Sequence, residues 1–459
     1  MKNLKISLFI LSFSNSIYSK DLFEDYYKQA LEIMSKMTIE EKIGQLFFPS
    51  YNSLKPSEDI PKYKPGGIIF NSDDFNKDEI TIKTAIKEMQ TLSENIIGIP
   101  LGLAVNEEGG NNNVVSLKHR IAGAFPSVQS IYKESGVDGV LKINQEKREL
   151  LRKFNLNINL APVADISNNS KDYIYSRTLG QNADITADYI AKDIEGYIKD
   201  NFTCCVKHFP GYGNNKETKL DASIDNRKFD ILYREDFIPF INAIDKGVPM
   251  IYFAHIISTC KDSIYPASFS KTWHDYLRDD LSFSGLILTE IYMENIDKYT
   301  KGKSPSVAAI NAGNDIILTD DFYIHYEDVI KAVKNGDINE DTINVACRRI
   351  ISWKLRYLYS ENVNIGNSTT INNVNTKDKI IGNSSSINED DIEKINKYYN
   401  KSNNNKKLII VLCVVFGCVG IFSILFIIYI YKKKKTSTPP AAIGQESVGG
   451  LLVQVNNNK

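Results

Sequence analysis

Short apolar runs that alternate with longer amphipathic stretches constrain the fold of this chain more than any other feature. Between about residues 25 and 359, eight such runs recur, and several are separated by stretches whose apolar residues lie three and four positions apart. This alternation is typical of parallel strands that are joined by helices. We expect the strands near residues 43–48, 67–70, 101–105, 158–163, 204–206, 250–254, 286–289 and 315–318.

The expected helices include residues 80–97, 183–200 and 234–246, which lie between predicted strands. We therefore predict an α/β fold, a (β/α)8 TIM-like barrel that forms a single folded domain over residues 20–360. A doubly wound open sheet is the alternative, because the number of strands alone does not establish that the sheet closes.

Polar residues follow five of the predicted strands at the point where each strand ends. In a parallel barrel the carboxyl ends converge on one mouth, and that face carries the active site in barrel enzymes. A single polar residue at a strand end is usually satisfied by a neighbouring loop, but five strands that share the feature indicate a common site. The residues are Asn106 with Glu107 and Glu108, Asp165, Lys207, His208, His255 and Glu290.

The N-terminal segment has the layout of a secretory signal peptide. Lys2 and Lys5 precede a short apolar run at residues 6–13, and small or polar residues follow that run. We expect residues 1–19 to be a signal peptide that is cleaved near Ser19. The folded part would then be exported.

A second apolar segment predicts a transmembrane helix. Residues 408–431 are almost wholly apolar, which is enough to cross a hydrocarbon core of about 30 Å. Lys432 to Lys435 follow directly and place that end in the cytosol. We expect residues 361–407 to form a disordered stalk and residues 432–459 a short cytosolic tail. The chain would be a single-pass type I membrane protein with its barrel on the extracellular or lumenal side.

Composition excludes several other classes of function. A net charge of -1 gives no excess of basic charge to attract nucleic acid. The six cysteines form no CxxC pair, so we expect neither a zinc site nor a disulfide framework, although one bridge among Cys204, Cys205, Cys260 and Cys347 stays open. No phosphate-binding glycine loop or cluster of metal ligands is recognisable, and we expect no cofactor and no metal.

A set of motifs in a fixed order carries a family resemblance. The run Lys-His-Phe-Pro-Gly-Tyr-Gly at residues 207–213 is preceded by Glu-Gly-Gly at 108–110, Leu-Ala-Pro-Val-Ala-Asp at 160–165 and Arg-Thr-Leu-Gly at 177–180, and Ala-Gly-Asn-Asp follows at 312–315. This set resembles glycoside hydrolase family 3, in the branch of bacterial β-N-acetylglucosaminidases. The resemblance spans roughly residues 35–355 and implies a catalytic barrel that acts on carbohydrate.

The resemblance also implies roles for individual residues. The family nucleophile is an Asp in a Thr-Asp-Asp-Leu-x-Met segment, and here Thr-Glu-Ile-Tyr-Met at residues 289–293 places Glu290 at that carboxylate. Retaining glycosidases need such a nucleophile and a second group that donates a proton. The positions that match sugar contacts, and the neighbouring His of the sixth strand, are Asn106, Asp165, Arg177, Lys207, His208 and His255.

The proton donor departs from the family pattern. The family reads Asp-Ser-His after the glycine-rich loop, whereas residues 221–223 read Asp-Ala-Ser, so Ser223 replaces the donor His. A hydroxyl of very high pKa is a poor general acid near neutral pH. Asp221, which matches the Asp that orients the His, is the substitute acid we favour, and Glu217 and Asp225 are alternatives.

Two hypotheses follow from these residues. The first is a membrane-anchored glycosidase of the β-N-acetylhexosaminidase type that hydrolyses O-glycosidic bonds through Glu290, with Asp221 as the acid. The second is a catalytically silent barrel that binds sugar or a surface partner through Asp165, Arg177, Lys207 and His208. Loss of aryl glycoside hydrolysis on substitution of Glu290 would separate them.

Overall fold

The computed structural model describes residues 21–359, and eight parallel strands form a nearly closed barrel within them. From the second strand onward, each of the eight pairs with the next along the chain, and the last pairs with the first. A parallel bridge between Ser50 and Ile69 joins the first two strands and brings the ring to near closure. The strands are β1 (Phe47–Pro49), β2 (Gly67–Ile69), β3 (Gly102–Val105), β4 (Ile158–Asn159), β5 (Thr203–Phe209), β7 (Met250–Phe253), β9 (Leu286–Glu290) and β10 (Ile316–Thr319).

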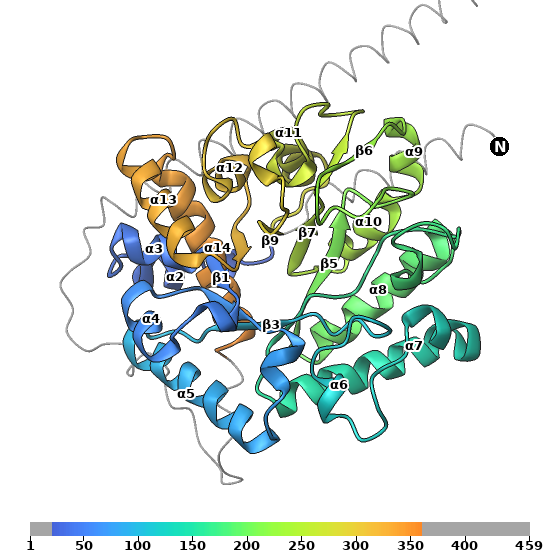
Figure 1. Ribbon diagram of the computed structural model, residues 1–459, viewed down its shortest axis with the longest axis horizontal. Coiled ribbons are helices and arrows are strands. Elements are labelled where there is room, and N and C mark those ends of the chain that lie inside the picture. Colours follow the sequence, from blue (N-terminus) through green and yellow to red (C-terminus); the bar gives the residue numbers. More distant parts are fainter. Residues whose placement is uncertain (1–20, 360–459) are drawn as a thin grey trace, which may run out of the picture. The chain divides into compact units, whose positions relative to one another are not determined.

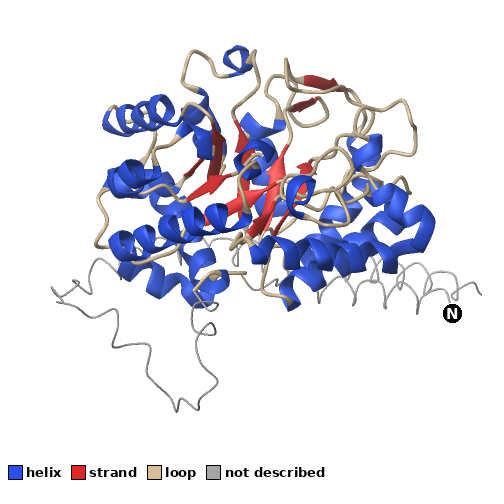
Figure 2. Ribbon diagram, turned by 60° about the horizontal axis from the view of Figure 1, so that its bottom comes forward, coloured by secondary structure: helices blue, strands red, loops and turns tan. Residues whose placement is uncertain are grey.

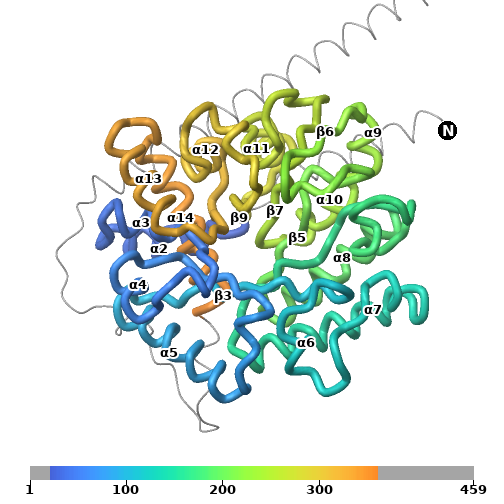
Figure 3. The backbone as a smooth tube through the Cα atoms, viewed as in Figure 1, coloured from blue at the N-terminus to red at the C-terminus, as the bar shows by residue number. Residues whose placement is uncertain are grey.

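Helices surround the strands. The chain runs once around the barrel axis from α3 through α5, α8, α10 and α12 to α13 (Figures 1 and 3), and Figure 2 shows the strands enclosed by helices. The helices are α2 (Tyr27–Met34), α3 (Ile39–Gln45), α4 (Pro56–Tyr63), α5 (Glu79–Ile97), α6 (Ser116–His119), α7 (Val128–Lys153), α8 (Ala183–Lys199), α9 (Phe229–Arg234), α10 (Phe237–Asp245), α11 (Lys271–Asp275), α12 (Pro305–Ala312), α13 (Phe322–Lys334) and α14 (Glu340–Tyr357).

The predicted barrel is confirmed, and the alternative of an open doubly wound sheet is wrong. An open sheet would leave two edge strands, whereas β1 has a neighbour on each side, β10 through a ladder and β2 through the single bridge. Two strand boundaries differ from the prediction. Residues 43–45 end helix α3, because Thr38 and Glu41 form a capping box that starts a helix in front of β1. Regular pairing in β4 stops at Asn159, although isolated hydrogen bonds to β5 continue beyond it.

The strand β7 shows how the barrel sorts its side chains. Met250 and Tyr252 pack in the same apolar cluster as Leu288 of β9, whereas Ile251 and Phe253 pack in a second cluster with residues of α10. Side chains alternate along a strand, so these two sets face opposite sides of the sheet. Tyr252 is level with Lys207 of β5 and Leu288 of β9 in the strand register.

A second, two-stranded parallel sheet lies beyond the barrel strands. It pairs β6 (Ser223–Asp225), in the loop after β5, with β8 (Ile256–Ser258), which follows β7 almost directly. Figure 2 shows this pair apart from the barrel strands, among the loops at one end. Ser223, which replaces the donor His of the family pattern, is therefore the first residue of a strand rather than part of an irregular loop.

Four predicted segments lie outside the described residues. They are the signal peptide at 1–19, the stalk at 361–407, the transmembrane helix at 408–431 and the tail at 432–459. Between residues 21 and 359, every helix is too short or too polar to span a bilayer. The four cysteines in that range, Cys204, Cys205, Cys260 and Cys347, are all unbridged.

Candidate active site

Strand β5 delivers the centre of the site. The Lys207 ammonium donates to Asn106 Oδ1 at 2.8 Å and pairs with Glu108 Oε1 at 2.5 Å. Arg177, from a short helix after β4, grips the same carboxylate with two hydrogen bonds of 2.7 and 2.9 Å. Glu108 is therefore shared by two cations, and it joins the ends of β3 and β5 to the segment after β4.

Burial and charge act against each other in this cluster. Burial alone would raise the pKa of Glu108, but Lys207 and Arg177 outweigh it and hold that pKa well below its usual value. Burial lowers the pKa of Lys207, and the charge of Glu108 opposes this shift. The two cations thus keep the carboxylate ionised, and loss of that carboxylate would leave both cations without this counter-charge.

His208 is held by the carboxylate at the end of β4. Its Nδ1 lies 2.6 Å from Asp165 Oδ2, and its Nε2 lies 3.2 Å from Arg177 Nη2. A guanidinium can only donate, so Nε2 accepts, and Nδ1 carries the proton that is donated to Asp165. Burial lowers the pKa of His208, Asp165 opposes it, and Arg177 adds to the lowering. The imidazole is thus a neutral and fully oriented group.

Glu290 is the last residue of strand β9. Its Oε2 accepts a hydrogen bond from the Tyr252 hydroxyl. The Tyr252 ring in turn contacts His208 edge to face, with ring centroids 5.9 Å apart. His255 is buried nearby with its Nδ1 2.7 Å from Ser268 Oγ, and the charge of Glu290 partly offsets the burial that lowers its pKa.

Asp221 lies in a different setting. Its two oxygens bond to the Lys298 ammonium and to the Tyr299 hydroxyl, the latter at 2.6 Å. These two hydrogen bonds lower the pKa of Asp221. The backbone fastens the same loops together, because the N–H groups of Glu294 and Asn295 donate to the carbonyls of Lys219 and Leu220, each at 3.0 Å. The segment after β5 is thus tied to the segment after β9.

The alternative acids are placed no better for proton donation. Glu217 is exposed and accepts a hydrogen bond from Tyr173. Asp225 is buried under the guanidinium of Arg227, which also pairs with Asp236. Ser223 donates to Asn215 Oδ1 at 3.0 Å and accepts from the Lys216 N–H. Each of these side chains is already engaged in holding the loop.

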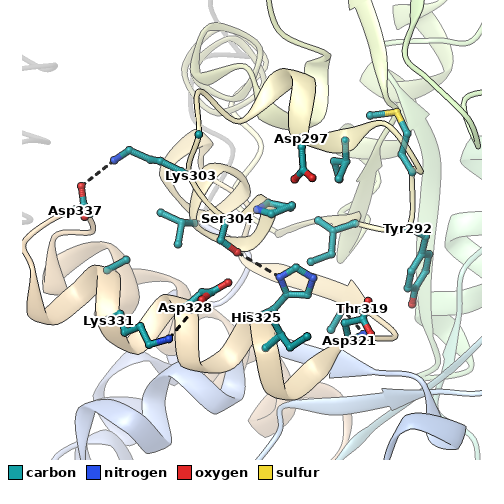
Figure 4. A pocket seen from close by; sticks show the side chains of 18 of the residues that line it. Tyr292, Asp297, Lys303, Ser304, Thr319, Asp321, His325, Asp328, Lys331 and Asp337 are labelled. Carbon is teal, nitrogen blue, oxygen red and sulfur yellow. Dashed lines mark hydrogen bonds and ion pairs between the residues drawn. The ribbon is translucent and has the colours of Figure 1, made fainter.

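A cavity of about 740 Å³ opens beside the ends of β9 and β10, between the segment after β9 and helix α13 (Figure 4). Lys303 pairs with Asp337 at 3.1 Å along its wall, and Ser304 Oγ lies 3.4 Å from His325 Nδ1. None of the residues predicted at the strand ends lines this cavity, whereas Ile291 and Tyr292, which follow Glu290, do. The cluster around Lys207 is therefore the better candidate for the reacting centre.

The structure brings most of the predicted residues together. Asn106, Asp165, Arg177, Lys207 and His208 form one hydrogen-bonded cluster, Glu290 and His255 lie next to it, and Asp221 bonds to Lys298 and Tyr299 instead.

Sequence reasoning did not assign a role to Glu108 or Tyr252. Glu108 follows β3 and carried a usable signal, whereas Tyr252 lies inside an apolar run and looks like an ordinary strand residue. Between residues 21 and 359, no group of three acidic, His or Cys side chains is arranged to hold a metal ion.

A parallel barrel whose mouth gathers carboxylates, buried cations and an oriented imidazole defines a class of barrel proteins that bind polar small molecules. A comparison with family models assigns the chain to one family within that class. The family model for the glycosyl hydrolase family 3 N-terminal domain matches residues 38–353, and the chain belongs to that family.

Known proteins similar to this chain agree with the family. An uncharacterised secreted glycosyl hydrolase of Arthroderma benhamiae is 26% identical over 68% of this chain and 92% of its own length. A β-hexosaminidase of Actinobacillus pleuropneumoniae serotype 5b is 28% identical over 62% of this chain and 84% of its own length. A family 3 β-N-acetylglucosaminidase structure from Paenibacillus superimposes with a TM-score of 0.66 at 23% identity, covering 74% of this chain and 66% of that chain.

Proposed function

We propose that the protein is a retaining glycosidase that removes a terminal N-acetylhexosamine, with Glu290 as the nucleophile. One observation carries the proposal: Glu290 ends β9 with its carboxylate fixed by Tyr252, beside the oriented His208 and the cations of Lys207 and Arg177. Such charged and oriented donors hold ring hydroxyls in one pose. The β-hexosaminidases among its relatives favour an N-acetylated sugar.

In the proposed first step, an oxygen of Glu290 attacks the anomeric carbon as the bond to the leaving oxygen breaks. The leaving oxygen takes the electron pair, and water then hydrolyses the glycosyl ester. Asp221 is the acid that the sequence predicts, but its lowered pKa and its bonds to Lys298 and Tyr299 favour the carboxylate over the proton donor. We infer that the best substrates have leaving groups that need little protonation.

The test is turnover of 4-nitrophenyl N-acetyl-β-glucosaminide by residues 20–405 and by the Glu290→Ala variant. We expect turnover in the wild type and a loss of at least about a thousandfold in the variant. Azide should restore part of the lost rate and give a glycosyl azide of inverted configuration, because it replaces the missing carboxylate. Unchanged turnover in Glu290→Ala would rule out this nucleophile.

A silent sugar-binding barrel is the second candidate, and the setting of Asp221 favours it, since this favoured substitute for the donor His is already bonded to Lys298 and Tyr299. Binding of N-acetylglucosamine measured by calorimetry separates the two. Millimolar or tighter binding that Lys207→Met abolishes, without turnover of any aryl glycoside, would establish the silent barrel. Turnover lost with Glu290 would exclude it.

We also propose that the protein is exported and anchored. The support is the apolar layout of residues 1–19, the apolar run at 408–431 and the four lysines that follow it, together with a relative that is named as secreted. Residues 20–360 would form the barrel outside the cytosol, with 361–407 as a stalk and 432–459 inside. Protease added to intact cells should remove the barrel, and truncation after residue 407 should release it into the medium.

A further inference from the structure

We propose that Tyr252 is a positioning residue for Glu290, which fixes one carboxylate oxygen so that the other faces the sugar. This inference rests on the proposed function. Its basis is the hydrogen bond from the Tyr252 hydroxyl to Glu290 Oε2. Among the described residues, the other oxygen, Oε1, has no hydrogen-bond partner, and it is the atom left for attack on the anomeric carbon.

The barrel holds the Tyr252 ring rigidly. Tyr252 is 7% exposed, faces the interior between β5 and β9, and packs against His208. An aromatic side chain has only two rotatable torsions, and both are restricted by this packing. The hydroxyl is therefore presented at one place, directly below the end of β9.

Glu290 needs such a restraint more than its neighbours do. Its side chain has three torsions, is half-buried at a strand end, and forms no ion pair among the residues from 21 to 359. A carboxylate that drifts by about 1 Å from the reacting carbon can lose about a hundredfold in rate. One hydrogen bond from a rigid donor removes most of that freedom.

The phenol is suited to donate rather than to react. Burial raises the pKa of Tyr252 well above its usual value, and the charge of Glu290 raises it further. Tyr252 thus keeps its proton through both chemical steps, and no bond to it forms or breaks. Its contribution comes entirely through the orientation of Glu290.

The experiment is a double-mutant cycle on 4-nitrophenyl N-acetyl-β-glucosaminide with Tyr252→Phe, Glu290→Asp and the pair. We expect Tyr252→Phe to lower kcat by about 10- to 100-fold with KM changed less than about threefold. The Asp side chain is shorter and withdraws its carboxylate from the hydroxyl. Adding Tyr252→Phe to Glu290→Asp should then cost less than about threefold more.

The matched control is Tyr326→Phe. Tyr326 is buried as deeply, and its hydroxyl donates to the Glu40 carbonyl at 3.1 Å on the outside of the barrel, away from β9. This variant loses one buried hydroxyl without touching Glu290, and its kcat should stay within about twofold of the wild type. A Tyr252→Phe variant that behaves like this control overturns the inference.

Several other outcomes also count against it. Losses that multiply fully in the pair would show that Tyr252 acts independently of Glu290. No turnover in the wild type, or full turnover in Glu290→Ala, would defeat the proposed function and the role of Tyr252 with it. Turnover that depends on Glu290 but is indifferent to Tyr252→Phe would defeat the positioning role alone.

An activated 5-fluoro glycosyl fluoride of N-acetylglucosamine gives a second readout, because it traps the nucleophile as a stable ester. The trapped peptide should contain Glu290 by mass spectrometry. The rate of labelling should fall in Tyr252→Phe by about the same factor as kcat, since both report attack by the same oxygen. Equal labelling rates in the wild type and the variant would contradict the inference.

Discussion

The two ends of the segment from Lys207 to Ser223 differ in their burial and in the residues that they contact. Lys207 and His208 lie at the end of β5, are nine-tenths or more buried, and bond to groups on the segments that follow β3 and β4. Asp221 and Ser223 lie outside the barrel strands, just before and at the start of β6, are partly exposed, and bond to residues of the segments after β9 and β5. A strand end couples chemistry to stability, whereas a loop position can change its residue without unfolding the barrel.

Charge compensation explains why the strand-end half is constrained. Glu108 serves two cations, so each member of the cluster is required by the others. The loop-side acid lacks that constraint, because the ion pair of Asp221 with Lys298 is open to solvent and contributes little. Under the proposed function, this contrast would allow the barrel to keep the charged cluster at its strand ends while the residue at the proton-donor position changes.

The largest expected effect is the loss of stability in Glu108→Gln. The neutral amide leaves Lys207 and Arg177 without a counter-charge in a buried site, which should lower the free energy of unfolding by about 3–5 kcal/mol. Urea denaturation of residues 20–405 measures it. Glu217→Gln is the control, because that side chain is exposed and should change the free energy by less than about 0.5 kcal/mol. Equal losses of stability in Glu108→Gln and Glu217→Gln would show that the strand-end cluster is no more constrained than the loop.

The pH dependence of stability sharpens the same point. The pKa of Glu108 is lower in the folded protein than its unfolded value of about 4.3. Its contribution is therefore fully present above about pH 4.3 and is lost as pH falls through the folded pKa. The wild type should lose stability more steeply than Glu108→Gln between about pH 4.5 and 3. If stability falls equally with pH in the wild type and in Glu108→Gln, then Lys207 and Arg177 do not hold the pKa of Glu108 below its unfolded value.

The sequence predicts the barrel and the strand-end cluster because local signals encode both. Apolar runs fix the strands, and polar residues such as Asp165 and His208 at their ends must meet once the sheet closes. The tie between Asp221 and Lys298 joins distant parts of the chain and leaves no local pattern. The role of Tyr252 could not be predicted for another reason, since an aromatic residue inside an apolar run is as consistent with core packing as with a role in the site.

The next effect, in order of size, tests whether the donor can be restored. Ser223→His should raise turnover of an alkyl N-acetyl-β-glucosaminide by less than about threefold, because Lys298 and Tyr299 already occupy both oxygens of the carboxylate that would orient the new imidazole. Adding Lys298→Met frees one oxygen and should bring the rise to about tenfold. Lys298→Met alone is the control and should give no rise. A large gain from Ser223→His alone would show that Asp221 is free to act.

The smallest expected effect is that of Asp221→Asn, which tests whether Asp221 is a general acid or only a structural contact of the loop. Asp221→Asn keeps the shape of the side chain and removes the charge that Lys298 meets, at a partly exposed site where such pairs are worth less than about 1 kcal/mol. If Asp221 only fastens the loop, turnover of 4-nitrophenyl and alkyl glycosides should fall by less than about threefold and by the same factor. A general acid would behave differently, because its loss costs about 10²- to 10⁴-fold on the alkyl leaving group and spares the aryl one. The ratio of the two rates, measured in the wild type and in Asp221→Asn, therefore distinguishes an acid from a fastening contact even when both losses are small.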